Sequence, residues 1–112
     1  MKIAIPTAEG RLCMHFGHCQ VFSIAEVNEE TKEIISLTEG VPPAHEPGAL
    51  PKWLSENGAD TIIAGGMGMR AQQLFSGYGI KVIVGAPSEA PEEIVKQYLA
   101  GSLETGGNIC DH

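Results

Sequence analysis

The order of the hydrophobic patterns along the chain constrains its fold more than any other feature. Residues 2–6 form a short apolar run closed by proline, and residues 20–27 and 32–38 follow with patterns typical of strands. Because only the polar residues 28–31 separate the last two runs, they are expected to form an antiparallel hairpin. After Gly58 the pattern changes to strand and helix in alternation. This order predicts an α/β domain.

The second half of the chain supplies the remaining strands and two of the three helices. Buried strands are expected at residues 60–64 and 80–84, each followed by a helical pattern, and a short helix is expected before them at residues 49–57. Ser88 is placed to cap the last helix, which Gly101 ends. A first strand, a hairpin and two right-handed crossovers predict a five-stranded mixed sheet with three helices.

The length of 112 residues allows one domain with a sizeable core and little room for a second lobe. Residues 1–101 are expected to form this single α/β domain. Residues 102–112 contain few apolar side chains and two adjacent glycines, so they are expected to be a flexible tail. An extended tail of this length spans about 35 Å, so Cys110 and His112 could reach either end of the sheet.

The segment from Cys13 to Cys19 brings two thiols and two imidazoles together within seven residues. Cys13, His15, His18 and Cys19 are the side-chain types that bind zinc, copper and iron–sulfur species. One such residue alone would more often be a packed cysteine or a solvated histidine. Four in seven residues predict a metal site.

Strand direction is expected to gather further ligands at the same edge of the sheet. If the first, fourth and fifth strands are parallel, the Cys13–Cys19 loop leaves from the same edge as the glycine-rich turn at residues 65–68. The hairpin returns to that edge, so the loop that carries His45 begins there too. Cys110 and His112 complete the set of predicted metal ligands.

The glycine-rich turn precedes a helix and predicts an anion-binding or cluster-binding backbone. The candidate cofactor-binding residues are Gly65, Gly66, Met67, Gly68 and Arg70. The turn lacks the Lys-Ser/Thr pair of a P-loop, so nucleotide binding is disfavoured. The alternative is that the glycines serve only a tight strand-to-helix connection and that Met67 fills the core.

The charge of the chain excludes several classes of partner. The net charge is −7 with only seven Lys and Arg, which disfavours nucleic acid and anionic membrane surfaces. No apolar run is long enough to span a bilayer, and a cytoplasmic location is expected. Three cysteines in a reducing compartment favour metal or thiol chemistry over a disulfide framework.

Several motifs together resemble the dinitrogenase iron–molybdenum cofactor biosynthesis family. They are Met1 to Pro6, His15-Phe16-Gly17, Gly65 to Gly68 with Arg70-Ala71, and Gly85-Ala86. The resemblance implies a ribonuclease H-like fold and non-enzymatic binding or carriage of an iron–sulfur or molybdenum-containing cluster, as in nitrogenase cofactor assembly. It also implies proteins that donate and receive the cluster as partners.

Two classes of function stay open at this point. The first is the metallocluster carrier, for which a single thiophilic ion such as zinc or copper is the alternative cargo. The second is a thiol or redox enzyme that uses Cys19, activated by the neighbouring His18. The absence of a Cys-x-x-Cys pair disfavours the enzyme. Both a monomer and a homodimer are compatible with the sequence.

Overall fold

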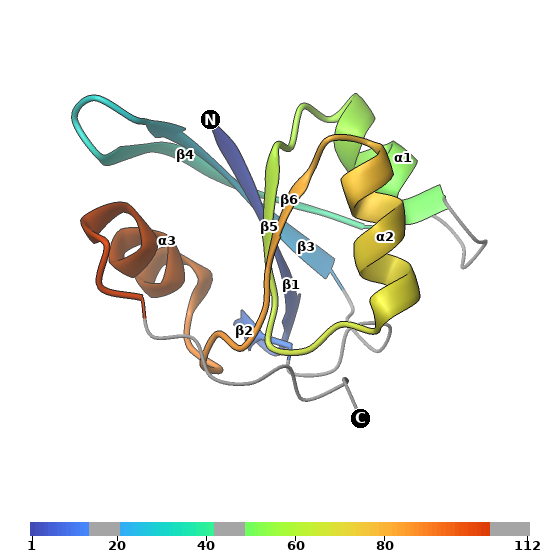
Figure 1. Ribbon diagram of the computed structural model, residues 1–112. Helices are drawn as coiled ribbons and strands as arrows, with labels where there is room; N and C mark the ends of the chain where they lie inside the picture. Colours follow the sequence, from blue (N-terminus) through green and yellow to red (C-terminus); the bar gives the residue numbers. More distant parts are fainter. Residues whose placement is uncertain (14–20, 42–48, 104–112) are drawn as a thin grey trace.

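A mixed sheet separates two helical layers in the computed structural model, which describes residues 1–13, 21–41 and 49–103 (Figure 1). Helices α1 and α2 cover one face and α3 covers the other. The strands are β1 (Lys2–Ala8), β2 (Arg11–Leu12), β3 (Val21–Asn28), β4 (Glu33–Gly40), β5 (Thr61–Ile63) and β6 (Lys81–Ile83), and the helices are α1 (Ala49–Glu56), α2 (Met69–Gly77) and α3 (Pro91–Ala100). None of these helices is long and apolar enough to cross a lipid bilayer.

The strand order confirms the mixed sheet and its hairpin. The main path is β4-β3-β1-β5-β6. β3 is antiparallel to both β1 and β4, whereas β1, β5 and β6 run parallel to one another. The parallel pairs require crossovers, and the segments that make them contain α1 and α2, as the sequence predicts.

The sheet has six strands, one more than the sequence predicts. The sixth is β2, which folds back on β1 so that Ala8 pairs with Arg11. A two-residue turn joins them, and both Glu9 and Gly10 have positive φ angles, of 56° and 80°. Such turns match the twist of a hairpin. The sequence did not predict this strand, because two residues are too few to show alternation and glutamate is an unusual residue at positive φ.

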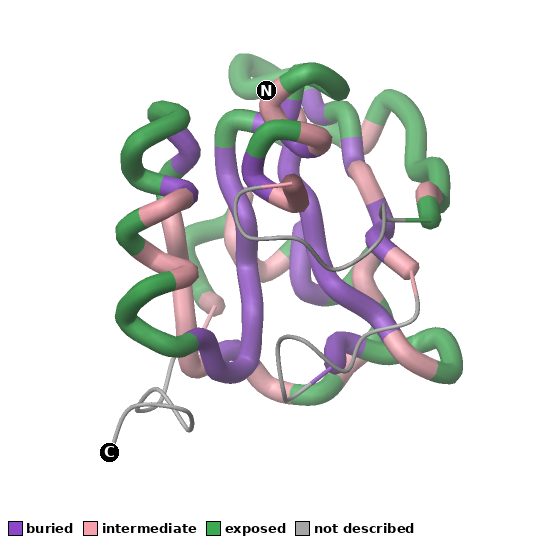
Figure 2. Tube along the Cα trace, turned by 90° about the vertical axis from the view of Figure 1, so that its right-hand side faces the viewer, coloured by how far each residue is buried: buried purple, intermediate pink, exposed green. Residues whose placement is uncertain are grey.

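Alternation along the strands divides the core between the two faces. Ile3 and Ile5 of β1 pack with the buried side of α3, whereas Ala4 between them packs with the core under α1 and α2. β3 follows the same rule, since Val27 faces α3 and Phe22 faces the other layer. Figure 2 shows the buried residues concentrated in the central strands. The long strands therefore hold both layers in place.

The ends of α3 confirm one predicted signal and correct another. Gly101 ends the helix in the left-handed conformation, with φ of 74°. Ser88 is not the N-cap: Ala90 occupies that position, and Pro91 is the first helical residue. The Ser88 hydroxyl instead donates a hydrogen bond to the carbonyl oxygen of Leu12, at 3.0 Å. A side chain that bonds another segment of the chain is not available to cap its own helix.

Candidate functional site at the rim of the sheet

One edge of the sheet collects the ends of four strands. β1, β5 and β6 are parallel and finish there, and β4 finishes there too because β3 lies between it and β1 and is antiparallel to both. The register shows this directly, since Gly40 pairs with Phe22 and Phe22 pairs with Pro6. We call this edge, formed by residues 7–13, 40–41, 64–68 and 84–90, the rim. Ligands of open α/β sheets bind at such an edge.

Cys13 is the predicted metal ligand that the structure describes, and it lies at the rim. Its side chain is buried, and its backbone N–H donates to the carbonyl oxygen of Pro6, at 2.8 Å. The other predicted ligands lie outside the described residues: His15, His18, Cys19, His45, Cys110 and His112.

The residues that border two of the undescribed segments lie at the rim. Segment 14–20 follows Cys13 and precedes Val21, which pairs with Thr7 at the end of β1. Segment 42–48 follows Val41, directly after the end of β4. The residues that border the segment with His15, His18 and Cys19 and the segment with His45 therefore lie at the edge where the glycine-rich turn lies.

The glycine-rich turn is buried at its start and exposed where α2 begins. Gly65 and Gly66 are buried, whereas Gly68 and Arg70 are exposed. Gly68 is the N-cap of α2 and makes no side-chain capping bond, and the first turn carries no acidic residue. This helix end can therefore attract an anion with its backbone dipoles.

Met67 belongs to the core under α1 and α2, where its side chain is fully buried. Its carbonyl oxygen accepts a hydrogen bond from the Gln72 side-chain amide, at 2.8 Å. The structure thus gives Met67 a packing contact with the core, in line with the core-filling alternative.

Backbone hydrogen bonds fix the rim segments to one another. Leu12 donates to the Glu89 carbonyl at 2.9 Å, in addition to accepting from Ser88. Gly85 donates to the Gly65 carbonyl, also at 2.9 Å. The β2 segment before Cys13, the connection from β6 to α3 and the glycine-rich turn thus form one braced unit. These bonds left no signal in the sequence, because they join residues with no common periodicity.

The single tryptophan lies beside the end of β4. Trp53 of α1 packs its ring against Phe22 in an edge-to-face arrangement, with ring centroids 6.0 Å apart. A Cβ atom placed on Gly40 would lie 3.0 Å from two carbons of the indole ring. Because Gly40 and Phe22 lie next to the rim, the fluorescence of Trp53 can report on events there.

The described residues alone do not form a metal centre. Within residues 1–13, 21–41 and 49–103, no three His, Cys, Asp or Glu side chains gather as metal ligands would. This part of the rim supplies one thiol, a glycine-rich backbone, a helix N-terminus and the charge of Arg70. Thiols and positively polarised backbone groups of this kind are able to bind anionic, thiophilic species.

The comparison with known families identifies one match over most of the chain. The sequence model of the family described as dinitrogenase iron-molybdenum cofactor matches residues 1–101. An uncharacterized protein of Methanocaldococcus jannaschii is 36% identical over 110 residues, which cover 93% of this chain and 90% of that protein.

Solved structures share the fold over nearly the whole length. The crystal structure of PH0822 superimposes with a TM-score of 0.85 at 25% identity, covering 94% of each chain. The apo form of the orange protein from Desulfovibrio gigas superimposes with a TM-score of 0.72 at 21% identity, covering 96% of this chain and 93% of that one. At this identity the second similarity shows the fold alone.

Proposed function

Because the chain belongs to the dinitrogenase iron–molybdenum cofactor family, we propose that it binds and carries a metallocluster and catalyses no reaction of its own. The observation that carries this proposal is the convergence at the rim. Cys13, the residues that border segments 14–20 and 42–48, and the glycine-rich turn all lie at that edge. Thiolates and exposed backbone amides are the groups that an iron–sulfur or thiomolybdate species would require.

The roles follow from the chemistry of each group. Cys13 and Cys19 would supply thiolates, and the imidazoles of His15, His18 and His45 would complete the ligand set. The tail residues Cys110 and His112 are further candidate ligands. Because Gly68 is exposed and carries no side chain, a bulky cluster can approach the backbone closely there, and Gly65 and Gly66 would hold the turn from its buried side. The N-terminus of α2 and Arg70 would offset the negative charge of the cargo.

The fold class, the partner proteins, the compartment and the alternative cargo are part of the same proposal. We propose that the fold is ribonuclease H-like. The main strand order β4-β3-β1-β5-β6, with the second strand of that path antiparallel to both neighbours, supports this class. A carrier has to receive its cluster from one protein and release it to another, so the partners are a donor and a recipient. The compartment is proposed to be the cytoplasm, and zinc or copper is the alternative cargo.

Replacing Cys13 and Cys19 together by serine tests the carrier function. The wild type, purified anaerobically, is expected to take up metal when reconstituted with iron and sulfide or with thiomolybdate, and to lose Trp53 fluorescence as it does so. Serine ligates these metals poorly, so metal content in the double variant should fall to background.

Separate controls keep a folding defect apart from a ligand defect. Because Cys13 is buried, Cys19→Ser alone is assayed beside the double variant, and circular dichroism checks the fold of both. The carrier function is wrong if iron with sulfide, thiomolybdate, zinc and copper all leave the wild type indistinguishable from the double variant in spectrum and metal content.

Gly68→Ala separates the two possible roles of the glycine-rich turn. Gly68 has φ of −65° and ψ of 155°, which any residue adopts, and an added Cβ would meet nothing within 4 Å. Because glycine is favoured over alanine at an N-cap, the free energy of unfolding should fall by no more than about 1 kcal/mol. A methyl group at the place where the cargo approaches should weaken binding on the order of tenfold.

The matched control is Gly77→Ala at the other end of α2, where an added Cβ also meets nothing within 4 Å. It should leave cluster affinity unchanged. Equal affinities for the Gly68 variant and the wild type, measured by titration of the Trp53 fluorescence, would assign Gly68 a role in the turn only.

A further inference from the structure

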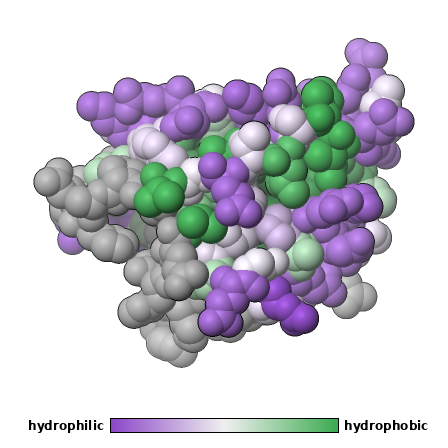
Figure 3. All heavy atoms as spheres, turned by 180° about the vertical axis from the view of Figure 1, so that it is seen from behind, coloured by the Kyte–Doolittle hydropathy of each residue, from purple (hydrophilic) through white to green (hydrophobic). Residues whose placement is uncertain are grey.

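The edge strand β4 exposes an unusual amount of apolar surface. Of the five large hydrophobic residues that are exposed among the described residues, three lie in or directly after this strand: Ile35, Leu37 and Val41, with 62%, 42% and 75% of their surface exposed. Figure 3 shows apolar side chains reaching the surface among hydrophilic ones on the face seen from behind. β4 is eight residues long and, in the described sheet, pairs only with β3. A long apolar edge strand is a site for strand addition.

A bulge at Ile35 shapes this edge. Val27 pairs with Ile34 and its neighbour Glu26 pairs with Ser36, so Ile35 is an extra residue without a partner in β3. The bulge brings Ile34 and Leu37 onto the same face of the sheet, although they are three residues apart.

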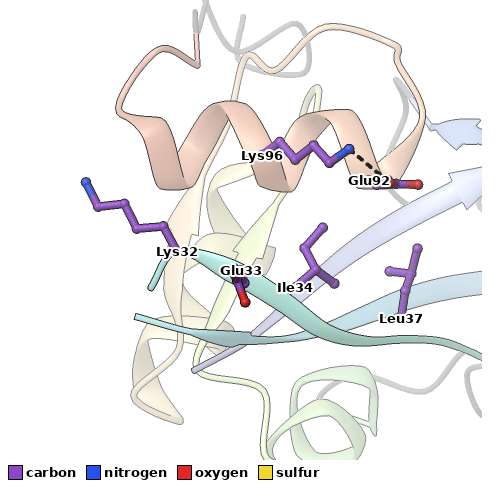
Figure 4. A pocket seen from close by; sticks show the side chains of 6 residues that line it. All are labelled: Lys32, Glu33, Ile34, Leu37, Glu92 and Lys96. Carbon is purple, nitrogen blue, oxygen red and sulfur yellow. Dashed lines mark ion pairs between the residues drawn. The ribbon is translucent and has the colours of Figure 1, made fainter. Parts of the chain in front are cut away.

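The two side chains point toward α3, as Figure 4 shows. They lie in a groove of about 490 Å³ that is also lined by Lys32, Glu33, Glu92 and Lys96. Glu92 and Lys96 form an ion pair along α3, with 3.0 Å between the charged atoms. The groove thus has an apolar floor between charges of both signs.

Hydrogen bonds show which residues of β4 offer their backbone to a further strand. Val27 donates to Met1 and the Val21 carbonyl accepts from Thr7, so the odd-numbered residues of β3 turn their backbone groups toward β1. The even-numbered residues then turn toward β4, as the bond from the Thr38 hydroxyl to the Ile24 carbonyl shows.

The same alternation fixes the outward groups of β4. Ser36 and Thr38 lie opposite even-numbered residues and turn toward β3, so Leu37 between them turns outward. Ile34 lies opposite Val27, which turns toward β1, so Ile34 turns outward as well. Ile34 and Leu37, which lie on either side of the Ile35-Ser36 pair, therefore both point their N–H and C=O groups away from the sheet.

We propose that β4 pairs in antiparallel fashion with β4 of a second copy of this chain, across a two-fold axis at the Ile35 bulge. In this register Ile34 lies opposite the second copy's Leu37, and each such pair exchanges two backbone hydrogen bonds. Lys32, which directly precedes β4 at a φ of 59°, is then brought close to the second copy's Glu39. Apolar residues meet apolar residues and cations meet anions, and symmetry makes each pair occur twice.

The edge of β4 is complementary to itself, which identifies a second copy of this chain as its binding partner. The two-fold axis would set the two α3 helices antiparallel on the same face of the joined sheet, so that the charges of Glu92 and Lys96 run in opposite order along the two helices. A two-fold pairing is closed, because it uses the same edge of both chains and leaves neither free for a third. The interface therefore yields a dimer and does not lead to open-ended growth.

Charge reversal tests this register in the full-length protein. Sedimentation velocity over increasing concentration should show a reversible dimer for the wild type. Lys32→Glu and Glu39→Lys should each raise the dissociation constant roughly tenfold, since each creates two like-charge pairs. The double variant should return to within about threefold of the wild type.

No contact within one chain explains such a rescue, because Lys32 precedes the start of β4 and Glu39 lies near its end, roughly 20 Å farther along the strand. Lys52→Glu and Glu56→Lys make the same charge changes on exposed residues of α1 and should leave the dimer unchanged. A wild type that stays monomeric up to about 1 mM overturns the proposal. So does a dimer that ignores the single reversals, or a double variant that is not rescued.

Discussion

Replacing Phe75 by alanine is expected to lower the free energy of unfolding by about 3 to 5 kcal/mol. Phe75 is the fully buried aromatic residue of α2 and packs in the core between this helix and the sheet. Its loss leaves a cavity and removes apolar contacts that hold α2 in place. Because α2 begins at the rim, such a variant should also loosen the glycine-rich turn. Urea denaturation followed by circular dichroism measures the change.

Tyr78→Ala is the matched control, since Tyr78 lies three residues later and is 45% exposed. Its truncation should cost less than about 1 kcal/mol. Similar losses for both variants would mean that the packing of α2 is not what stabilises this half of the molecule.

Gly40→Ala is expected to lower the free energy of unfolding by about 1 to 3 kcal/mol. The added methyl group would lie 3.0 Å from the Trp53 ring, in a position fixed by the backbone of β4 and by the contact of Trp53 with Phe22. The ring has to shift, so the Trp53 emission spectrum should change as well. Both quantities can be measured in one denaturation experiment.

Gly77→Ala supplies the comparison at a site where the added methyl group meets nothing within 4 Å. Because alanine is the better helix former, this change should be neutral or stabilising by up to about 1 kcal/mol. Should Gly40→Ala prove as stable as the Gly77 variant, with an unchanged emission spectrum, the ring is free to move and the close approach at Gly40 has no energetic consequence.

Hydrophobic periodicity was sufficient to predict most of the fold. Ala25 and Val27 of β3 pack on the α3 side, whereas Phe22 and Ile24 pack in the other layer, as the alternation of the sequence predicts. The features that the sequence missed depend on contacts between distant segments or on very short elements. β2 contains two residues, and the hydroxyl of Ser88 bonds Leu12, 76 positions away.

The candidate site, too, has features that the sequence predicted and features that it did not. Residue chemistry was enough to select Cys13 and the glycine-rich turn, and strand direction was enough to place both at one edge. What the sequence could not supply is the bracing between Leu12 and Glu89 and between Gly65 and Gly85, because backbone hydrogen bonds carry no residue signature. His15, His18, Cys19, His45, Cys110 and His112 remain predictions from chemistry alone.

The hydrogen bond that Leu12 accepts from Ser88 and the one that it donates to Glu89 also determine when the rim can exist during synthesis. Leu12 leaves the ribosome 76 residues before Ser88, a delay of about 4 to 15 s at ordinary elongation rates. Until then the segment before Cys13 has no partner on the α3 side, and the glycine-rich turn is not joined to Gly85. A growing chain therefore exposes its first thiol before the hydrogen bonds that brace the rim have formed. For the proposed carrier function, loading of a cluster would follow translation, and the donor would recognise the finished protein and not the nascent one.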